Sequence, residues 1–147
     1  MITKEYILSI IPELVEFESS EIETHVQTAQ GYDAVIALFE NIRTVNFPAV
    51  IIENRTSGNI LYDCGPLDNY SIPVWVMLQD NEKEPAEIYD DAFELMKKII
   101  KILIRDTSLG LLPGLDYTHM SYNMRSATDA YGYELLLTFR TDIDLSL

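Results

Sequence analysis

The feature that most constrains the fold is a long amphipathic helix predicted in the second half of the chain. Pro85 suits a first helical turn, and from Ala86 to about Arg105 the apolar residues recur at helical spacing. The charges agree with the helix dipole, since carboxylates crowd the first turns and lysines and Arg105 occupy the last ones. These apolar positions are Ile88, Ala92, Leu95, Met96, Ile99, Ile102 and Leu103. One apolar stripe of this length predicts a helix that packs along a sheet.

Two segments after this helix alternate between apolar and polar residues, which is typical of β-strands. The first, Thr118 to Arg125, predicts a strand with one buried face. The second, Tyr133 to Ile143, predicts a long final strand. The seven residues from Ser126 to Gly132 connect them, so we expect a terminal hairpin.

Three strands are predicted before the long helix. Ala49 to Glu53 and Ile60 to Cys64 flank turn residues at Asn54 to Asn59, and we expect them to pair as a hairpin. A loop, Gly65 to Asn69, then leads into Tyr70 to Gln79, whose β-branched and aromatic residues indicate a well-buried strand.

Two short helices are predicted near the N-terminus. The first has apolar residues at helical spacing from Ile7 to Val15 and Thr3 as its cap. Pro12 interrupts it, so the helix is either kinked or ends near Ile10. The second runs from Asp33 to Ile42, after a polar stretch, Glu18 to Gln30, that we expect to be loosely structured.

The element order is therefore α-α-β-β-β-α-β-β, in a single α+β domain spanning residues 1–147. We expect a mainly antiparallel sheet of about five strands, flanked by two or three helices. With 147 residues, 48% of them hydrophobic, the chain has enough apolar surface for a core without disulfides or metals.

Charge and composition exclude several classes of function. A formal charge of −14 repels nucleic acids and anionic lipids, so we expect neither direct DNA binding nor a membrane partner. The sequence predicts no signal peptide and no membrane span, and its one cysteine, Cys64, predicts an intracellular location. We expect the acidity to serve solubility in the first place, with a basic partner, a cation-rich setting, or a surface that DNA passes without sticking as the alternatives.

No catalytic group, metal site or cofactor site is predicted. His25 and His119 lack metal ligands at the usual spacing, and Cys64 reads as a structural thiol. The acidic run Asp80 to Pro85 departs from a calcium loop and predicts a solvated turn before the long helix. Asp142 and Asp144 stand two apart on one strand face, which is more typical of solubility than of a divalent cation site.

Tyrosines are the candidate interaction residues. Interfaces favour tyrosine because it contributes contact area and a polar tip at low entropic cost. Packing between strands of the same sheet explains most of the tyrosines in the last hairpin equally well. The four candidates for a partner interface in the last hairpin are Tyr117, Tyr122, Tyr131 and Tyr133.

The layout resembles that of small phage tail-terminator and head-tail joining (neck) proteins. The resemblance is carried by the strand Ile72 to Leu78, the long helix Pro85 to Arg105, and the ending Ala130 to Phe139. It spans nearly the whole chain, and it transfers no functional residue. The polar region Pro12 to Gln30 departs from a minimal terminator of this kind.

The resemblance implies a non-enzymatic subunit of a phage or prophage tail. Such a subunit forms a ring, typically hexameric, which stops tail-tube polymerisation and docks to tail or neck proteins, with DNA sliding over an acidic lumen. It would be found in the host cytoplasm and in the virion. The alternative is an acidic intracellular adaptor or inhibitor that binds a basic protein and is free to be monomeric.

Overall fold

The computed structural model describes residues 2–18, 21–41, 45–54, 57–62 and 65–146. The chain folds as an α+β protein, with six strands in one sheet in the described part. The strand order is β1-β2-β4-β6-β5, and β3 also pairs with β4. All strand pairs are antiparallel except β1 with β2, which are parallel. The predicted fold class is confirmed.

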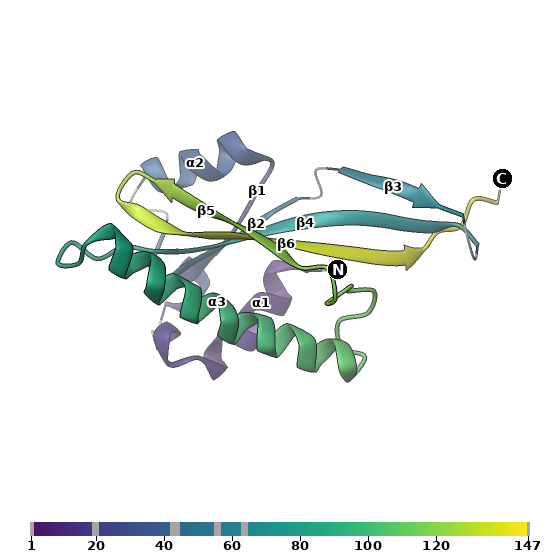
Figure 1. Ribbon diagram of the computed structural model, residues 1–147, viewed down its shortest axis with the longest axis horizontal. Helices are drawn as coiled ribbons and strands as arrows, with labels where there is room; N and C mark the ends of the chain where they lie inside the picture. The colour runs from purple at the N-terminus through teal and green to yellow at the C-terminus, as the bar shows by residue number, and fades with distance from the viewer. Residues whose placement is uncertain (1, 19–20, 42–44, 55–56, 63–64, 147) are drawn as a thin grey trace.

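The strands differ in length and in which helices pack on them. They are β1 (Val26–Ala29), β2 (Ala49–Glu53), β3 (Ser57–Leu61), β4 (Leu67–Leu78), β5 (Ser121–Ala127) and β6 (Ala130–Asp142). The helices are α1 (Lys4–Ile10), α2 (Tyr32–Glu40) and α3 (Pro85–Ser108). Helices α1 and α3 lie on one face of the sheet and α2 on the other, while β3 and the adjoining ends of β4 and β6 extend beyond the helices (Figure 1). We call this extension the arm.

The core has two layers, one on each face of the sheet. The larger layer joins the apolar stripe of α3 and residues of α1 to alternate residues of β4 and β6, such as Val74, Val76, Leu135 and Leu137. The smaller one joins α2 to the opposite face, around Trp75. Because α2 covers this second face, β2 is buried on both sides, and its residues Ala49–Glu53 are all buried.

The first helix ends where the proline requires. Thr3 caps α1 by accepting a hydrogen bond from the Tyr6 backbone N–H at 3.1 Å. The α-helix stops at Ile10, and Pro12 lies in a short 3-10 turn, Ile11–Glu13, so the second alternative predicted for Pro12 is confirmed. Two further 3-10 turns follow, Val15–Phe17 and Ile22–His25.

Strand β1 lies in the stretch predicted to be loosely structured, so that prediction was wrong there. Val26 and Ala29 are buried, but the two residues between them are polar, and four residues are too few to show a clear alternation. The strand forms because it pairs in parallel with β2, from Val26 opposite Val50 to Ala29 opposite Glu53.

The predicted hairpin of Ala49–Glu53 with the strand at residues 60–64 is also wrong. Strand β2 pairs with β1 on one side and with β4 on the other, so neither of its edges is open to β3. Strand β3 pairs instead with residues Leu67–Ser71 of β4, a stretch predicted in part as loop. Part of the expected turn, Arg55 and Thr56, lies outside the described residues.

Pro73 stands where β4 changes partner. On the edge that β4 shares with β2 and β3, the β3 ladder ends at Ser71 and the β2 ladder begins at Val74. Proline has no backbone N–H, and central strands ordinarily exclude it for that reason. Here, the missing donor interrupts neither ladder on this edge.

The terminal hairpin is confirmed, with a tighter turn than predicted. Ala127 pairs with Ala130, so the connection is two residues, Thr128 and Asp129, and not seven. Thr128 has a φ of 55°, the left-handed conformation that two-residue hairpin turns need at their first position. Threonine is uncommon there, so the sequence did not indicate the turn.

Candidate interaction surface

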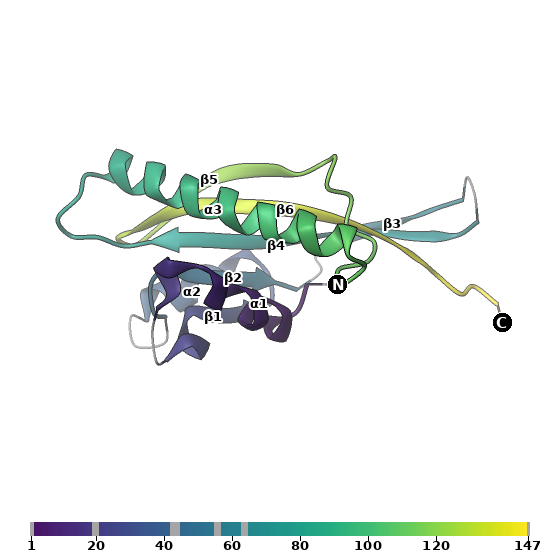
Figure 2. The same ribbon diagram turned by 90° about the horizontal axis from the view of Figure 1, so that it is seen from below.

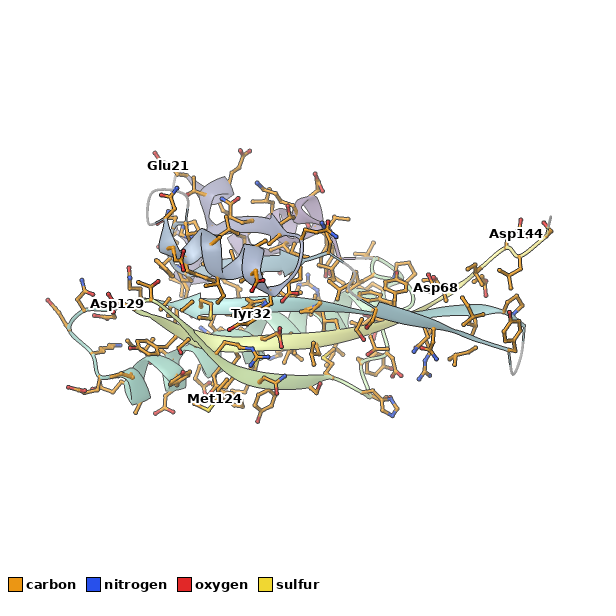
Figure 3. The ribbon with its side chains drawn as sticks, turned by 90° about the horizontal axis from the view of Figure 1, so that it is seen from above. Glu21, Tyr32, Asp68, Met124, Asp129 and Asp144 are labelled. Atoms are coloured by element: carbon orange, nitrogen blue, oxygen red, sulfur yellow. The ribbon has the colours of Figure 1, made fainter. Side chains whose placement is uncertain are left out.

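Strand β5 forms one outer edge of the sheet. It pairs with β6 on one side, and it is the last strand in the order on the other. The predicted buried face of this strand is wrong, because Tyr122 is 52% and Met124 57% exposed. Helix α3 packs on β6 and β4, so the sheet continues past the helix at β5 (Figure 2). Figure 3 shows Met124 along this outer strand.

An aromatic cluster lines the junction of this face with α3. Phe93 of α3 lies 5.5 Å from both Tyr122 and Tyr133, measured between ring centroids, and Tyr122 lies 5.6 Å from Tyr133. All three contacts are edge-to-face, the favoured geometry for aromatic pairs. Tyr89 extends the cluster to Tyr131 and Tyr133, at 5.5 and 5.9 Å.

The four predicted tyrosines therefore have different settings. Tyr122, Tyr131 and Tyr133 join this cluster, but only Tyr122 is largely exposed, and Tyr133 is 8% exposed. Tyr117 is 47% exposed in the loop before β5 and takes no part in these ring contacts. Cross-strand packing accounts for Tyr133, while Tyr117 and Tyr122 present open ring surface.

Besides β1 and β5 at the ends of the strand order, β3 forms a further edge of the sheet, on the arm. Among the described residues, β3 pairs only with β4, and four of its five residues are exposed. Ile60 is 37% and Tyr62, just beyond the strand, 67% exposed. The other border of the arm is covered, because the backbone of Gly114 and Asp116 bonds to Arg140 and Thr138 of β6 at 2.8 and 2.9 Å.

Polar side chains link the strands of the arm on its α2-side face. The Asn69 amide donates to Asn59 Oδ1 at 2.8 Å, and Arg140 Nε donates to Asn69 Oδ1 at 3.1 Å. Arg140 also lies 3.4 Å from the carboxylate of Asp116. This network fixes β3 to β4 and β6 where no helix covers them.

An ion pair between Arg125 and the buried Glu134 holds β5 to the sheet on the face that α2 covers. Arg125 of β5 donates to Glu134 Oε1 at 3.1 Å, and its guanidinium lies 5.8 Å from the Trp75 ring and 5.9 Å from the Tyr32 ring. Trp75 Nε1 donates to Glu53 Oε1 at 2.6 Å. Burial, reinforced by the Glu134 carboxylate, raises the pKa of Glu53 despite the Trp75 hydrogen bond.

Gly132 permits this close arrangement of strands. A Cβ atom at this position would stand 2.0 Å from the Val76 carbonyl oxygen and 3.0 Å from the Met77 Cα. Both are backbone atoms of β4, the central strand. Only glycine fits such an approach between neighbouring backbones.

The residues considered for metal binding are placed apart. His25 is buried, with Nδ1 2.8 Å from the Pro48 carbonyl oxygen and Nε2 3.1 Å from the Asn46 amide nitrogen. The carbonyl only accepts, so Nδ1 carries a proton and the Asn46 amide donates to Nε2. His119 is exposed, and its Nδ1 lies 2.9 Å from Asp116 Oδ2.

The acidic candidates also form no site among the residues that the structure describes. Asp80 accepts from the Glu82 backbone N–H at 2.9 Å in an exposed turn, and α3 then begins at Pro85. Asp142 and Asp144 are exposed. Among the described residues, no group of three or more His, Cys, Asp or Glu side chains is placed to hold a metal ion. Cys64 lies outside the described residues.

Sequence reasoning missed Tyr89 and Phe93 as partners of the tyrosines, and it missed the buried pair Glu53 and Glu134. Tyr89 and Phe93 are four residues apart on α3, so they form a second stripe beside the apolar one, and this signal was readable. Glu134 alternates with apolar residues and resembles a solvent-facing position. Only the presence of α2 on that face shows that it is buried.

No protein-family model matches the chain, and no curated protein matches it.

The structure also bears on membrane insertion. In the part of the chain that the structure describes, no helix combines the length and apolar character needed to cross a bilayer.

Proposed function

We propose that the chain is a non-enzymatic structural subunit of a phage or prophage tail, of the tail terminator or tail completion type. It acts by assembling with copies of itself into a ring and by docking to tail or neck proteins. In the tail-terminator proteins that the chain resembles, such a ring is typically hexameric. The observation that carries the proposal is that, in the described part of the chain, β3 and β5 are edge strands on opposite sides of the β4–β6 pair.

Open strand edges favour association because they present unpaired backbone donors and acceptors. Proteins that remain monomeric protect such edges with charged side chains, proline, bulges or very short strands. Strand β3 contains no charged residue, and β5 contains one, Arg125, which bonds within its own chain to Glu134. Two different edges also meet the requirement of head-to-tail contact, which closes into a ring when the rotation permits.

The net charge of the chain predicts how self-assembly depends on salt concentration. Each copy carries −14, so copies repel each other, and salt screens this repulsion over about 8 Å at 0.15 M against about 30 Å at 0.01 M. Assembly through neutral edges should therefore strengthen as salt rises. Association through ion pairs would weaken instead.

The test is the solution mass by light scattering behind a sizing column, over a range of concentrations at both salt levels. We expect mass to increase with concentration, and more so at 0.15 M. Met124→Lys places a charge on the exposed face of β5 and should lower the mass. Val15→Lys, at a residue 64% exposed outside both edges, is the matched control and should not. A monomer under every condition overturns the proposal.

One observation favours the adaptor as the second candidate. The cations Lys83, Lys98, Arg105, Arg125 and Arg140 each bond to a carboxylate of their own chain, which leaves a strongly acidic surface. Such a surface is complementary to a basic protein. A monomer that binds a basic protein with an affinity falling steeply with salt would support this alternative.

A further inference from the structure

We infer that copies of the chain join by adding β3 of one copy to β5 of the next, which continues the sheet across the boundary. The inference rests on the proposed self-assembly and names the two surfaces that meet. Strand direction is the first argument. Strand β3 runs antiparallel to β4, β4 to β6, and β6 to β5, so β3 and β5 point in opposite directions on opposite edges. A neighbouring copy in the same orientation therefore presents its β3 antiparallel to β5.

The side chains on the α3 side of the sheet give the second argument. Tyr122 and Met124 lie on this side of β5, since Tyr122 packs on Phe93. Gly58 and Ile60 lie on the same side of β3, because Gly58 is opposite Tyr70, whose ring stacks on Phe139 in the core layer of α3.

Residues directly opposite in an antiparallel ladder share a face, and this restricts the register. The pairing that sets Ile60 against Tyr122 places a β-branched side chain beside an aromatic one, a favourable cross-strand pair. It also sets Gly58 against Met124, where the glycine leaves room for the longer side chain. On the other face, Asn59 then stands opposite Asn123, amide against amide.

This register fixes the offset between copies. Asn59 is level with Asn69 of β4, and Asn123 is level with Glu134 and hence with Trp75. From Asn69 to Trp75, β4 advances six residues, about 20 Å at roughly 3.3 Å per residue. The strands β3, β4, β6 and β5 together span about 19 Å at roughly 4.8 Å each. The strands are then inclined by about 45° to the line along which the copies repeat. In a closed ring this line runs around the circumference, so the strands are also inclined by about 45° to the ring axis, a tilt found in closed barrels.

The register is tested by disulfide crosslinking. Cys64→Ser removes the one natural cysteine, and Asn59→Cys with Asn123→Cys then places thiols opposite each other across the proposed boundary. Under mild oxidation, the double variant should form a ladder of dimers, trimers and larger species that a reductant collapses. Each single variant should remain uncrosslinked. A control carrying Asn123→Cys and Ser9→Cys, with Ser9 exposed on α1, should form no ladder.

Each other outcome is decisive. A dimer from Asn123→Cys alone, with no larger species in the double variant, shows two β5 edges paired about a two-fold axis and overturns the inference. An oligomer of unchanged mass that forms no crosslink overturns this interface while leaving self-assembly standing. A wild-type monomer at every concentration and salt level overturns both proposals.

Discussion

Replacing Gly132 by alanine should disrupt the fold at the centre of its sheet. The new Cβ atom would stand 2.0 Å from the Val76 carbonyl oxygen, whereas an ordinary contact between such atoms is about 3.4 Å or more. The strands would have to separate by more than about 1 Å. Strand β4 cannot withdraw, because β2 pairs with it on the side away from β6.

The cost follows from what that separation breaks. Two neighbouring ladder hydrogen bonds, at about 1 kcal/mol each, would be lost or stretched, and their buried donors and acceptors would lose their partners. The tightly packed core around Val76 would also open. We expect Gly132→Ala to lower the free energy of unfolding by about 3–5 kcal/mol, a large part of the total for a domain of this size.

Urea unfolding followed by circular dichroism measures this change. Gly58→Ala is the matched control, because its Cβ would stand 3.0 Å from the Asn69 carbonyl oxygen on edge strand β3, which is free to move outward. We expect it to cost less than about 1 kcal/mol. A loss below about 1 kcal/mol for Gly132→Ala would refute the argument that the central strands cannot separate.

Three smaller changes test other parts of the structure. Glu53→Gln should raise the melting temperature at pH 7. The raised pKa of Glu53 means that the folded protein favours the protonated carboxyl, so the wild type loses stability as pH rises above the ordinary glutamate pKa of 4.5. The gain from glutamine should therefore disappear as pH falls through 4.5, and an equal gain at pH 3 would contradict this reasoning. Tyr6→Phe should cost about 1 kcal/mol in urea unfolding by removing the 2.7 Å hydrogen bond to Asp106, and no change would mean that this bond does not stabilise α1 on α3. Thr128→Gly should gain about 1 kcal/mol in the same assay by relieving the left-handed conformation, whereas a loss would show that the threonine side chain has a compensating role.

The elements with strong local signals were predictable from sequence. Helix α3 begins at Pro85 as predicted, because its apolar stripe, its first-turn proline and its end charges all agree. The apolar residues that alternate along β6 from Tyr133 to Phe139 are likewise buried. These features depend on residues close together in the chain, so periodicity and capping rules detect them.

The failures concern partners that are distant in the chain. Strand β1 carries little pattern of its own and forms because β2 lies beside it. Strand β5 alternates well, but α3 does not extend over it, so its apolar residues are exposed. The pattern of a strand shows that it has two unlike faces, and only the tertiary arrangement decides which of them is covered. The candidate tyrosines were found by composition, while their separation into buried and exposed members required the packing of α3.

The change of partner along β4 also determines how the arm would carry mechanical load. A pull on β3 along its length is resisted by its ladder with residues Leu67–Ser71 and passes through β4 to β2 and β6. The ladder bonds lie across this direction, so several must break together, and none can open alone as in a zipper. If copies join through this arm as proposed, a strand that is continuous with the core would transmit tension from one copy directly into the folded body of the next.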